Sequence, residues 1–184
     1  MILVDKQILK KVSSGKLGIE PFCVDRVQPN SYDVSLSQNF TYIGRDCNDV
    51  LDVKDKNTYD LGAVSVRGCS IILTPGEFVL GETSEKVQLP DNIVASIEGK
   101  SSLARLGLQI HQTGGWIDAG FAGTITLELY NASPRPIKLY AGMPIGQLVF
   151  FKTKHCAIPY SRMPHAKYYQ QTGATTSKYY ENFK

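Results

Sequence analysis

Glu128 is the residue whose type and setting best suit it to proton transfer. It lies in the stretch "TITLELY" (residues 124–130), where apolar and polar side chains alternate. If this stretch is a strand, Ile125, Leu127 and Leu129 face the core and Glu128 faces the opposite side. A glutamate there is either solvated on the outer face of a sheet or directed into a pocket, where it could shuttle protons.

A second stretch, "GKSSLARLG" (residues 99–107), combines hydroxyls and cations beside a glycine. Ser101 and Ser102, with Lys100 and Arg105 supplying charge, could cradle an anion. The spacing is not that of a Walker loop, which requires Gly-x-x-x-x-Gly-Lys followed by Ser or Thr. The alternative is an ordinary helix cap.

A third stretch, "GGWIDAGFAG" (residues 114–123), holds four glycines in ten residues. Such a density indicates tight turns or close approach of the backbone to a ligand. Asp118 in this turn could bond to its own backbone, or it could hold a sugar hydroxyl or a hydrated metal. Trp116 and Phe121 favour packing in a core or interface over stacking on a base.

The elements that must position these residues are mainly strands. The chain has 184 residues, of which 42% are hydrophobic and 20% are charged, which is typical of one globular domain. Turn signals at intervals of about ten residues predict an all-β sandwich or barrel. The predicted strands are residues 31–36, 39–44, 69–74, 77–83, 92–99, 123–131, 136–142 and 145–153.

Two helical features are expected besides the strands. Residues 5–13 form a short amphipathic pattern, with Asp5 as the expected cap of the free amides and Gly15 as the stop. Residues 101–108 could add one helical turn. The segment 161–184 is polar, rich in tyrosine and without strand alternation. It is either a frayed tail or a mobile flap whose Lys167, Tyr168 and Gln171 reach a ligand.

Charge and cysteine usage narrow the function classes. The net charge of +3 is spread along the chain, unlike the basic stripe of a nucleic-acid-binding protein, and a nucleotide needs only a few cations. We expect a cytoplasmic protein without a membrane span, because no run approaches ~20 apolar residues and the amino terminus lacks a signal-peptide core. The cysteines lack metal-site spacing, so we expect buried or half-buried free thiols at Cys23, Cys47, Cys69 and Cys156.

Together these stretches resemble the deoxycytidine triphosphate (dCTP) deaminases of the trimeric dUTPase superfamily. The similar motifs are "EGKSSLARLGL", "HQTGGWIDAGFAGTITLELYN" and "AGMPIGQLVF", with "QPNSYDVSL" before them and "AKYYQQTG" after them. The resemblance runs from about Leu3 to Gly173. It implies a distorted β-barrel or jelly-roll fold, with residues 1–160 as the β domain and 161–184 as its C-terminal lid. It also implies a homotrimer with active sites between subunits.

The resemblance assigns the catalytic roles. Glu128 matches the general acid/base, which takes a proton from the water that attacks C4 of cytosine and delivers protons to N3 and to the departing ammonia. Ser101 and Arg105 match residues that hold the water and polarise the tetrahedral centre from the neighbouring subunit. The family works without zinc, and the His-x-Glu and Pro-Cys-x-x-Cys signature of zinc deaminases is missing from this sequence.

The resemblance also assigns substrate contacts. Asp118 matches the residue that holds the deoxyribose, and Mg²⁺ is expected to bridge the oxygens of the triphosphate. The full set of substrate-binding residues is Lys100 and Ser102 for the phosphates, Thr113, Trp116 and Asp118 in the glycine-rich loop, and Tyr160, Lys167 and Gln171 in the closing C-terminal segment.

Two kinds of enzyme occur in the family. Some members stop at dUTP, whereas others hydrolyse the triphosphate too and release dUMP for thymidylate synthesis. "HQTGGWIDAGF" is more similar to the dUMP-forming type, because Gly115 and Trp116 replace a histidine and an arginine. In such an enzyme Asp118 is a candidate to orient the water that attacks the α-phosphorus. Gly114 replaces the alanine that is usual in the family. Feedback inhibition by dTTP acts through this loop in the family, so it does not carry over simply to this chain.

Two further functions stay open at the level of the sequence. A plain dUTPase would share the Asp118 turn but typically lacks the "TLEL" glutamate and the Arg105 spacing. A nucleotide-sensing module on the same fold would bind without turnover, because a fold does not by itself imply a function.

Overall fold

Antiparallel strands build most of this protein. The structure is a computed structural model that describes residues 1–44, 50–60 and 63–183, so Cys47 lies outside the described residues. The first sheet has the order β5 (Val64–Arg67), β4 (Asn39–Tyr42), β7 (Phe78–Gln88), β11 (Ala122–Asn131) and β9 (Leu108–Gln109), with β1 (Gly18–Glu20) also paired to β7. The second has the order β10 (Trp116–Ile117), β8 (Ile93–Gly99), β13 (Pro144–Lys152), β3 (Ser31–Ser35) and β2 (Val27–Gln28). A two-stranded ribbon joins β12 (Ile137–Tyr140) to β6 (Ser70–Leu73).

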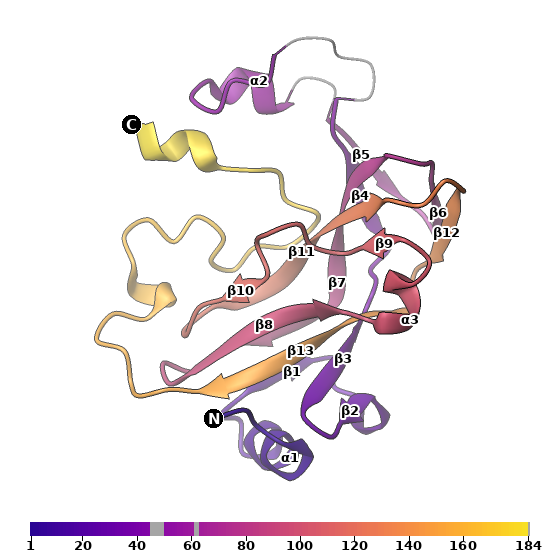
Figure 1. Cartoon of the computed structure of the whole chain (residues 1–184). Helices are drawn as coiled ribbons and strands as arrows, with labels where there is room; N and C mark the ends of the chain where they lie inside the picture. The colour runs from indigo at the N-terminus through magenta and orange to yellow at the C-terminus, as the bar shows by residue number, and fades with distance from the viewer. Residues whose placement is uncertain (45–49, 61–62, 184) are drawn as a thin grey trace.

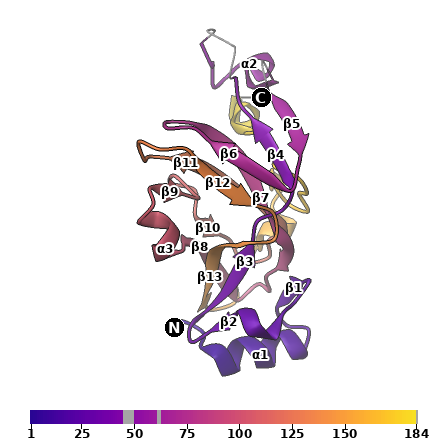
Figure 2. The same cartoon turned by 90° about the vertical axis from the view of Figure 1, so that its right-hand side faces the viewer.

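The helical segments are short. The α-helices are α1 (Asp5–Ser13), α2 (Lys56–Asp60) and α3 (Ser101–Ala104), and the 3₁₀ turns are η1 (Val24–Arg26), η2 (Tyr160–Arg162) and η3 (Tyr179–Phe183). In Figures 1 and 2, α1 lies at one end of the molecule and α2 at the other, with the sheets between them. The expected mainly β, distorted barrel with a short N-terminal helix is confirmed. Within the described part of the chain the strands form separate ladders and do not close into one barrel.

The core lies where the two larger sheets face each other. Strand β3 contributes Tyr32 and Val34, and β11 contributes Leu127 and Leu129, all of which are fully buried. An isolated bridge between Leu36 and Thr83 ties the two sheets together along their backbones. The alternation predicted for β11 is therefore confirmed, because its apolar residues point into this core.

Helix α1 ends as expected but begins differently. Gly15 follows the helix with φ +69°, a conformation that favours glycine, and so stops it. The residue at the cap position is Val4, whose N–H donates to the side-chain oxygen of Gln7 at 3.1 Å. Asp5 lies one residue further on and bonds to the N–H of Lys6 at 2.6 Å. The expectation that Asp5 caps the helix was wrong, since Gln7 reaches back to the free amide first.

Sequence patterns missed the shortest and most exposed elements. Strand β5 is exposed along its whole length, so its side chains carry no buried face that alternation could mark. Strands β2, β9 and β10 have two residues each, which is too short for a period to be recognised.

The thiols are free but more exposed than expected. Cys23 and Cys69 are exposed and Cys156 is half-buried. The expectation of burial was wrong for Cys23 and Cys69, because both lie in exposed connections beside short elements. In the described ranges, no helix has the length and apolar character needed to cross a membrane.

Candidate functional site

Glu128 lies on the face of β11 that turns away from the core. Its ladder partner on β7 is Leu80, and its backbone N–H donates to the carbonyl of Ile110 at 2.9 Å. One carboxylate oxygen, Oε2, accepts the backbone N–H of Gln112 at 2.6 Å. The strand and the preceding loop together fix one oxygen of the carboxylate and leave the other to the open side.

The glycine-rich loop approaches the second oxygen of Glu128. A methyl group at Gly114 would lie 3.2 Å from Glu128 Oε1. At Gly115 a methyl group would lie 3.1 Å from the carbonyl of Ile97, whose N–H donates to the Gly115 carbonyl at 2.8 Å. The two glycines let the loop pack closely against β8 on one side and Glu128 on the other.

A cavity of about 770 Å³ opens in front of Glu128, and we call it the Glu128 cavity. Of the residues nominated from the sequence, six line it: Trp116, Asp118, Glu128, Tyr160, Tyr168 and Gln171. Its walls are largely apolar, with Leu80 and Ile125 from the sheet. This mixture of apolar wall and few polar groups is typical of a small-molecule site.

Two polar atoms in this wall have no hydrogen-bond partner among the described residues. They are Oγ1 of Thr126, two residues before Glu128, and Oε1 of Gln171 from the C-terminal segment. A buried polar atom without a hydrogen bond costs free energy, so such atoms mark places where a ligand or water completes the site. Thr126 was placed on the face of Glu128 by strand alternation, but it was not nominated as a binding residue.

Asp118 and Trp116 lie at the rim of the Glu128 cavity. Trp116 is 59% exposed, and its ring lies 5.9 Å from that of Phe151. Asp118 follows β10 and is exposed, and its carbonyl accepts the N–H of Phe121 at 3.1 Å. The Asp118 carboxylate is left available to a ligand at the cavity rim.

Tyr160 closes another side of the cavity. Its backbone N–H donates to the carbonyl of Ala119 at 2.8 Å, and its hydroxyl accepts the N–H of Tyr168 at 3.0 Å. Burial raises the pKa of the Tyr160 hydroxyl above its ordinary value of 10.0, although the Tyr168 N–H acts in the opposite direction. The hydroxyl therefore stays protonated at neutral pH and can donate a hydrogen bond.

The C-terminal segment and residues 51–59 complete the cavity mouth. Tyr168, Thr175 and Tyr179 line it from one side, and Val53 and Tyr59 from the other. Tyr59 contacts Tyr180 edge to face, with 5.3 Å between ring centroids. No periodic signal in the sequence pointed to residues 51–59, because their place in the wall depends on the fold of the C-terminal segment.

Lys167 and Thr113 are not part of the cavity lining. The Nζ of Lys167 donates to the side-chain oxygen of Asn182 and lies 5.7 Å from the centroid of the Tyr179 ring. Thr113 is exposed on the loop before Gly114. Both lie close to residues that do line the cavity, so their nominated roles stay predictions.

The other nominated residues lie on α3 and its flanks, a region that we call the α3 surface (residues 100–106). Ser101, Ser102 and Arg105 are exposed, and Leu106 is 59% exposed. None of the α3 surface residues lines the Glu128 cavity as far as the chain is described. Figure 1 shows α3 on the side of the molecule opposite to the C-terminal segment.

Lys100, at the start of the α3 surface, is already engaged. Its Nζ forms an ion pair with Asp33 Oδ2 at 2.6 Å, and Gln28 donates to the same oxygen at 3.3 Å. The other oxygen of Asp33 is buried and has no hydrogen-bond partner in the part of the chain that the structure describes. Lys100 must leave this ion pair, or share it, before it can contact a phosphate.

The side chains offer no protein-only metal centre within the described ranges, where no group of three or more His, Cys, Asp and Glu side chains could hold an ion. A catalytic zinc site needs three such ligands. An ion brought in by phosphates has different needs, because Mg²⁺ usually keeps several waters and takes only one or two carboxylates. Asp118, an exposed carboxylate at the cavity rim, fits that lesser requirement.

Comparisons with known proteins give a family for this chain. Residues 2–153 match the family model described as dCTP deaminase-like. The chain is 52% identical over 184 residues to the "dCTP deaminase, dUMP-forming" of Methanospirillum hungatei, covering 100% of this chain and 99% of that protein. It is also 52% identical over 183 residues to the protein of the same name from Methanosphaerula palustris, covering 99% and 97% respectively.

A solved structure gives the same answer for the fold. The crystal structure of the 2′-deoxycytidine 5′-triphosphate deaminase from Agrobacterium tumefaciens superposes with a TM-score of 0.61 at 27% identity. The match covers 81% of this chain and 47% of that one, so the present chain spans about half of the Agrobacterium protein. The family match extends over most of the sequence, and the relatives match it from end to end: this chain belongs to the dCTP deaminase-like family.

Proposed function

We propose that this protein hydrolyses the 4-amino group of dCTP and then the triphosphate, so that it releases dUMP, ammonia and pyrophosphate. The observation that carries the proposal is the Glu128 side chain, which lines a cavity of about 770 Å³ and has one carboxylate oxygen fixed by the Gln112 N–H. Relatives that are 52% identical over the full chain are named for this reaction.

Glu128 would act as the proton shuttle of the deamination. Water adds to C4 of cytosine and gives one proton to Glu128, which passes it to N3. Glu128 then takes the proton of the new C4 hydroxyl and passes it to the amino group, which leaves as ammonia while the C4 carbonyl forms. Proton transfer by a positioned side chain typically contributes about 10²–10⁴-fold to the rate. The Gln112 N–H holds the carboxylate in place through this exchange.

Two unpartnered atoms would help to recognise the base and the nucleotide. Thr126 Oγ1 and Gln171 Oε1 are buried in the cavity wall without hydrogen bonds. An amino or ring N–H group of a pyrimidine would satisfy an acceptor there, and a pocket that leaves such atoms unpaired discriminates against a base that lacks the group. Asp118 at the rim would hold the deoxyribose and then orient water for attack on the α-phosphorus.

The α3 surface would complete the active site of a neighbouring subunit. Ser101 and Arg105 would hold the attacking water and polarise the tetrahedral centre, yet both are exposed and away from the cavity of their own chain. Leu106 is exposed beside them and supplies an apolar contact suited to an interface. A homotrimer with heterologous contacts would place each α3 surface at the next chain's cavity in a closed ring.

The phosphates and the C-terminal lid make up the rest of the proposal. Mg²⁺ would enter with the triphosphate, and Lys100 and Ser102 would contact the phosphates from the α3 surface. Residues 1–160 would act as the β domain and 161–184 as the lid that closes over the substrate. Inhibition by dTTP stays a prediction, because it would act through the loop that carries Gly114.

The test is to incubate the protein with dCTP and Mg²⁺ and to measure nucleotides, ammonia and pyrophosphate over time. If dUMP, ammonia and pyrophosphate rise together without dUTP, both reactions occur as proposed. Accumulation of dUTP would leave the deamination but overturn the second hydrolysis. No turnover of dCTP, with nucleotide still bound, would favour a sensing module.

A further inference from the structure

Glu82 is a buried carboxylate that the proposed reaction does not use. It lies on β7 with 3% of its surface exposed, and it pairs across the ladder with Thr126 of β11. Leu80, two residues earlier on the same face, lines the Glu128 cavity. Glu82 therefore sits just beyond the inner end of the cavity, where an acidic side chain needs a specific reason to be buried.

Four hydrogen-bond donors surround the Glu82 carboxylate. Oε1 accepts from Asn39 Nδ2 at 2.6 Å and from Ser37 Oγ at 3.2 Å. Oε2 accepts from Thr124 Oγ1 at 2.8 Å and from the backbone N–H of Gly173 at 2.6 Å. These donors come from the β4 region, from β11 and from the C-terminal segment. Hydrogen bonds to an ionised acceptor are the strong ones, so one side chain connects three parts of the chain.

The bond to Gly173 falls where the C-terminal segment crosses the sheet. Before it, Gln170 N–H donates to the carbonyl of Ala122 at 2.7 Å, and Gln171 Nε2 donates to the carbonyl of Thr124 at 2.9 Å. After it, the carbonyl of Ala174 accepts from Thr41 Oγ1 at 3.0 Å.

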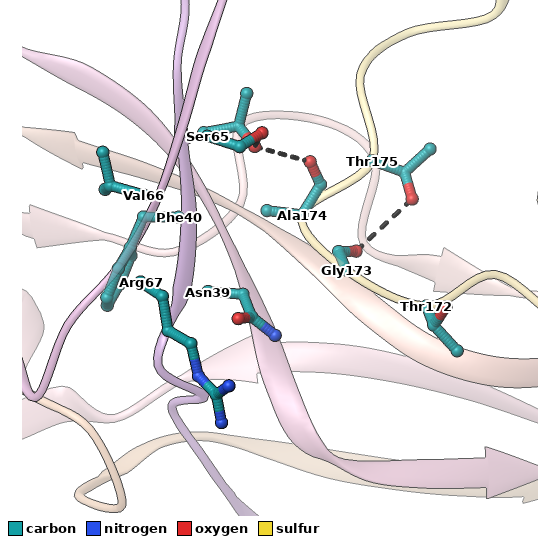
Figure 3. A pocket seen from close by; sticks show the side chains of 10 residues that line it. Asn39, Phe40, Ser65, Val66, Arg67, Thr172, Gly173, Ala174 and Thr175 are labelled. Carbon is teal, nitrogen blue, oxygen red and sulfur yellow. Dashed lines mark hydrogen bonds between the residues drawn. The ribbon is translucent and has the colours of Figure 1, made fainter.

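Figure 3 shows residues 172–175 beside Asn39, Ser65 and Arg67. These residues line a cleft of about 380 Å³. The segment borders both this cleft and the Glu128 cavity, because Thr175 lines both.

We propose that Glu82 is a positioning residue that holds the C-terminal segment on the sheet. It does so by accepting a hydrogen bond from the Gly173 N–H, a contact that we call the seat. By fixing Gly173 it holds Gln171 on one side and Thr175 on the other in the wall of the Glu128 cavity. Gly173 has φ +87°, so the chain turns sharply at the residue that Glu82 binds. That this seat serves dCTP binding rests on the proposed function, but the seat itself can be tested without substrate.

Glu85, three residues along β7, provides a matched control. It is fully buried, forms an ion pair with Arg26 and accepts from the N–H and the hydroxyl of Ser35 at 2.9 and 2.8 Å. These partners belong to the β3 side of the molecule. Substitution of Glu85 should weaken the fold without releasing the C-terminal segment, so it separates a general loss of stability from loss of the seat.

The experiment compares E82M, E82Q and E85Q in the full-length protein without nucleotide. Methionine keeps the length of the side chain but leaves the Gly173 N–H without an acceptor. Glutamine can keep an oxygen toward Gly173 while Asn39 and Ser37 reorient, so it should rescue the seat. The measurement is the rate of trypsin cleavage after Lys178, together with hydrogen exchange of the Gly173 amide.

We expect E82M to be cleaved about tenfold or more faster than wild type, and E82Q to stay within about threefold of it. E85Q should lower the melting temperature but keep the wild-type cleavage rate. Wild-type cleavage and Gly173 protection in E82M would overturn the proposal. If E82M fails to fold, hydrogen exchange of the Gly173 amide in the wild-type protein tests the proposal instead. Slow exchange supports the seat, and exchange at the rate of an unstructured peptide overturns it.

A second readout separates this inference from the proposed function. With dCTP, E82M should raise KM more than it lowers kcat. The C-terminal segment can still close over the substrate, but part of the binding free energy is spent on ordering it. Faster cleavage with an unchanged KM would support the seat and contradict the role of the segment in dCTP binding. A raised KM with wild-type cleavage and wild-type Gly173 protection would overturn the seat alone.

Discussion

The Glu128 cavity and the α3 surface differ in how far one chain completes them. In the cavity, Glu128 is held by a backbone N–H, and Asp118, Tyr160 and Gln171 face the same space. On the α3 surface, Ser101 and Arg105 are exposed and do not line the Glu128 cavity of their own chain. Preorganised polar groups act best where water is excluded, so exposed groups of this kind need a second surface. The difference fits the proposal that the Glu128 cavity and the α3 surface are two halves of one active site.

The largest expected effect concerns the cavity half-site. We expect E128Q to lower the rate of deamination by about 10²–10⁴-fold, because glutamine keeps the shape but cannot shuttle a proton. The affinity for dCTP should change little. Ammonia release measures the rate and equilibrium titration with dCTP measures binding. Deamination at the wild-type rate would contradict the proton-shuttle mechanism and would move the function away from the Glu128 cavity.

The next effect tests whether the two half-sites belong to different chains. We expect R105A alone to lose about 10²–10³-fold in kcat, the usual cost of removing a charge-stabilising donor. When R105A and E128Q chains are co-expressed in equal amounts, about a quarter of wild-type activity should return. Each shared site takes Glu128 from one chain and Arg105 from its neighbour at random, so about one site in four receives both intact residues. The measurement is kcat of the purified mixture.

Failure of the mixture to regain activity would place both residues in the site of one chain. A control mixture of E128Q with S101A/R105A should recover as well as the first, because both defects of the second chain lie on its α3 surface.

A smaller effect should follow from filling the space at Gly114. A methyl group there would lie 3.2 Å from Glu128 Oε1, so G114A must push the carboxylate by a few tenths of an ångström. A flexible side chain that lines a cavity can move by this amount, so we expect about a two- to fivefold decrease in kcat with KM almost unchanged.

Steady-state kinetics measures kcat and KM of G114A, with G68A as the control. The methyl group added in G68A would lie 3.4 Å from the Ser70 carbonyl, which is an ordinary contact. A loss as large as that of E128Q would mean that the loop cannot yield, and an unchanged kcat would mean that the position of Oε1 is not critical.

The smallest effect concerns the pH dependence of stability at the cavity wall. Burial raises the pKa of Tyr160 above 10.0, so above pH 10.0 the unfolded chain loses a proton that the folded chain keeps. The free energy of unfolding should therefore fall as the pH rises from 10.0 toward the folded pKa. Urea denaturation at about pH 9 and about pH 11 should show a smaller fall in Y160F than in wild type. Equal slopes would contradict the raised pKa.

Sequence patterns located Glu128 but left its environment open. Alternation in β11 placed it opposite Leu127 and Leu129, which are both buried in the structure. The same pattern fits a solvated outer face equally well, because a strand has two faces and its sequence does not say what covers the second. The resemblance to a family supplied the roles of the residues, which residue spacing by itself did not.

The amino-acid sequence by itself determined the strand-rich fold and the face of β11 that carries Glu128. It also determined the glycine-rich loop that approaches Glu128. Those features depend on local periods and on glycines, which act over a few residues. Only the tertiary structure decided that residues 51–59 and the C-terminal segment wall the cavity, that Lys100 pairs with Asp33, and that Glu82 is buried under Gly173. Such contacts join residues that are far apart in the sequence. A local pattern spans only a few residues, so it cannot predict which distant residues meet in the fold.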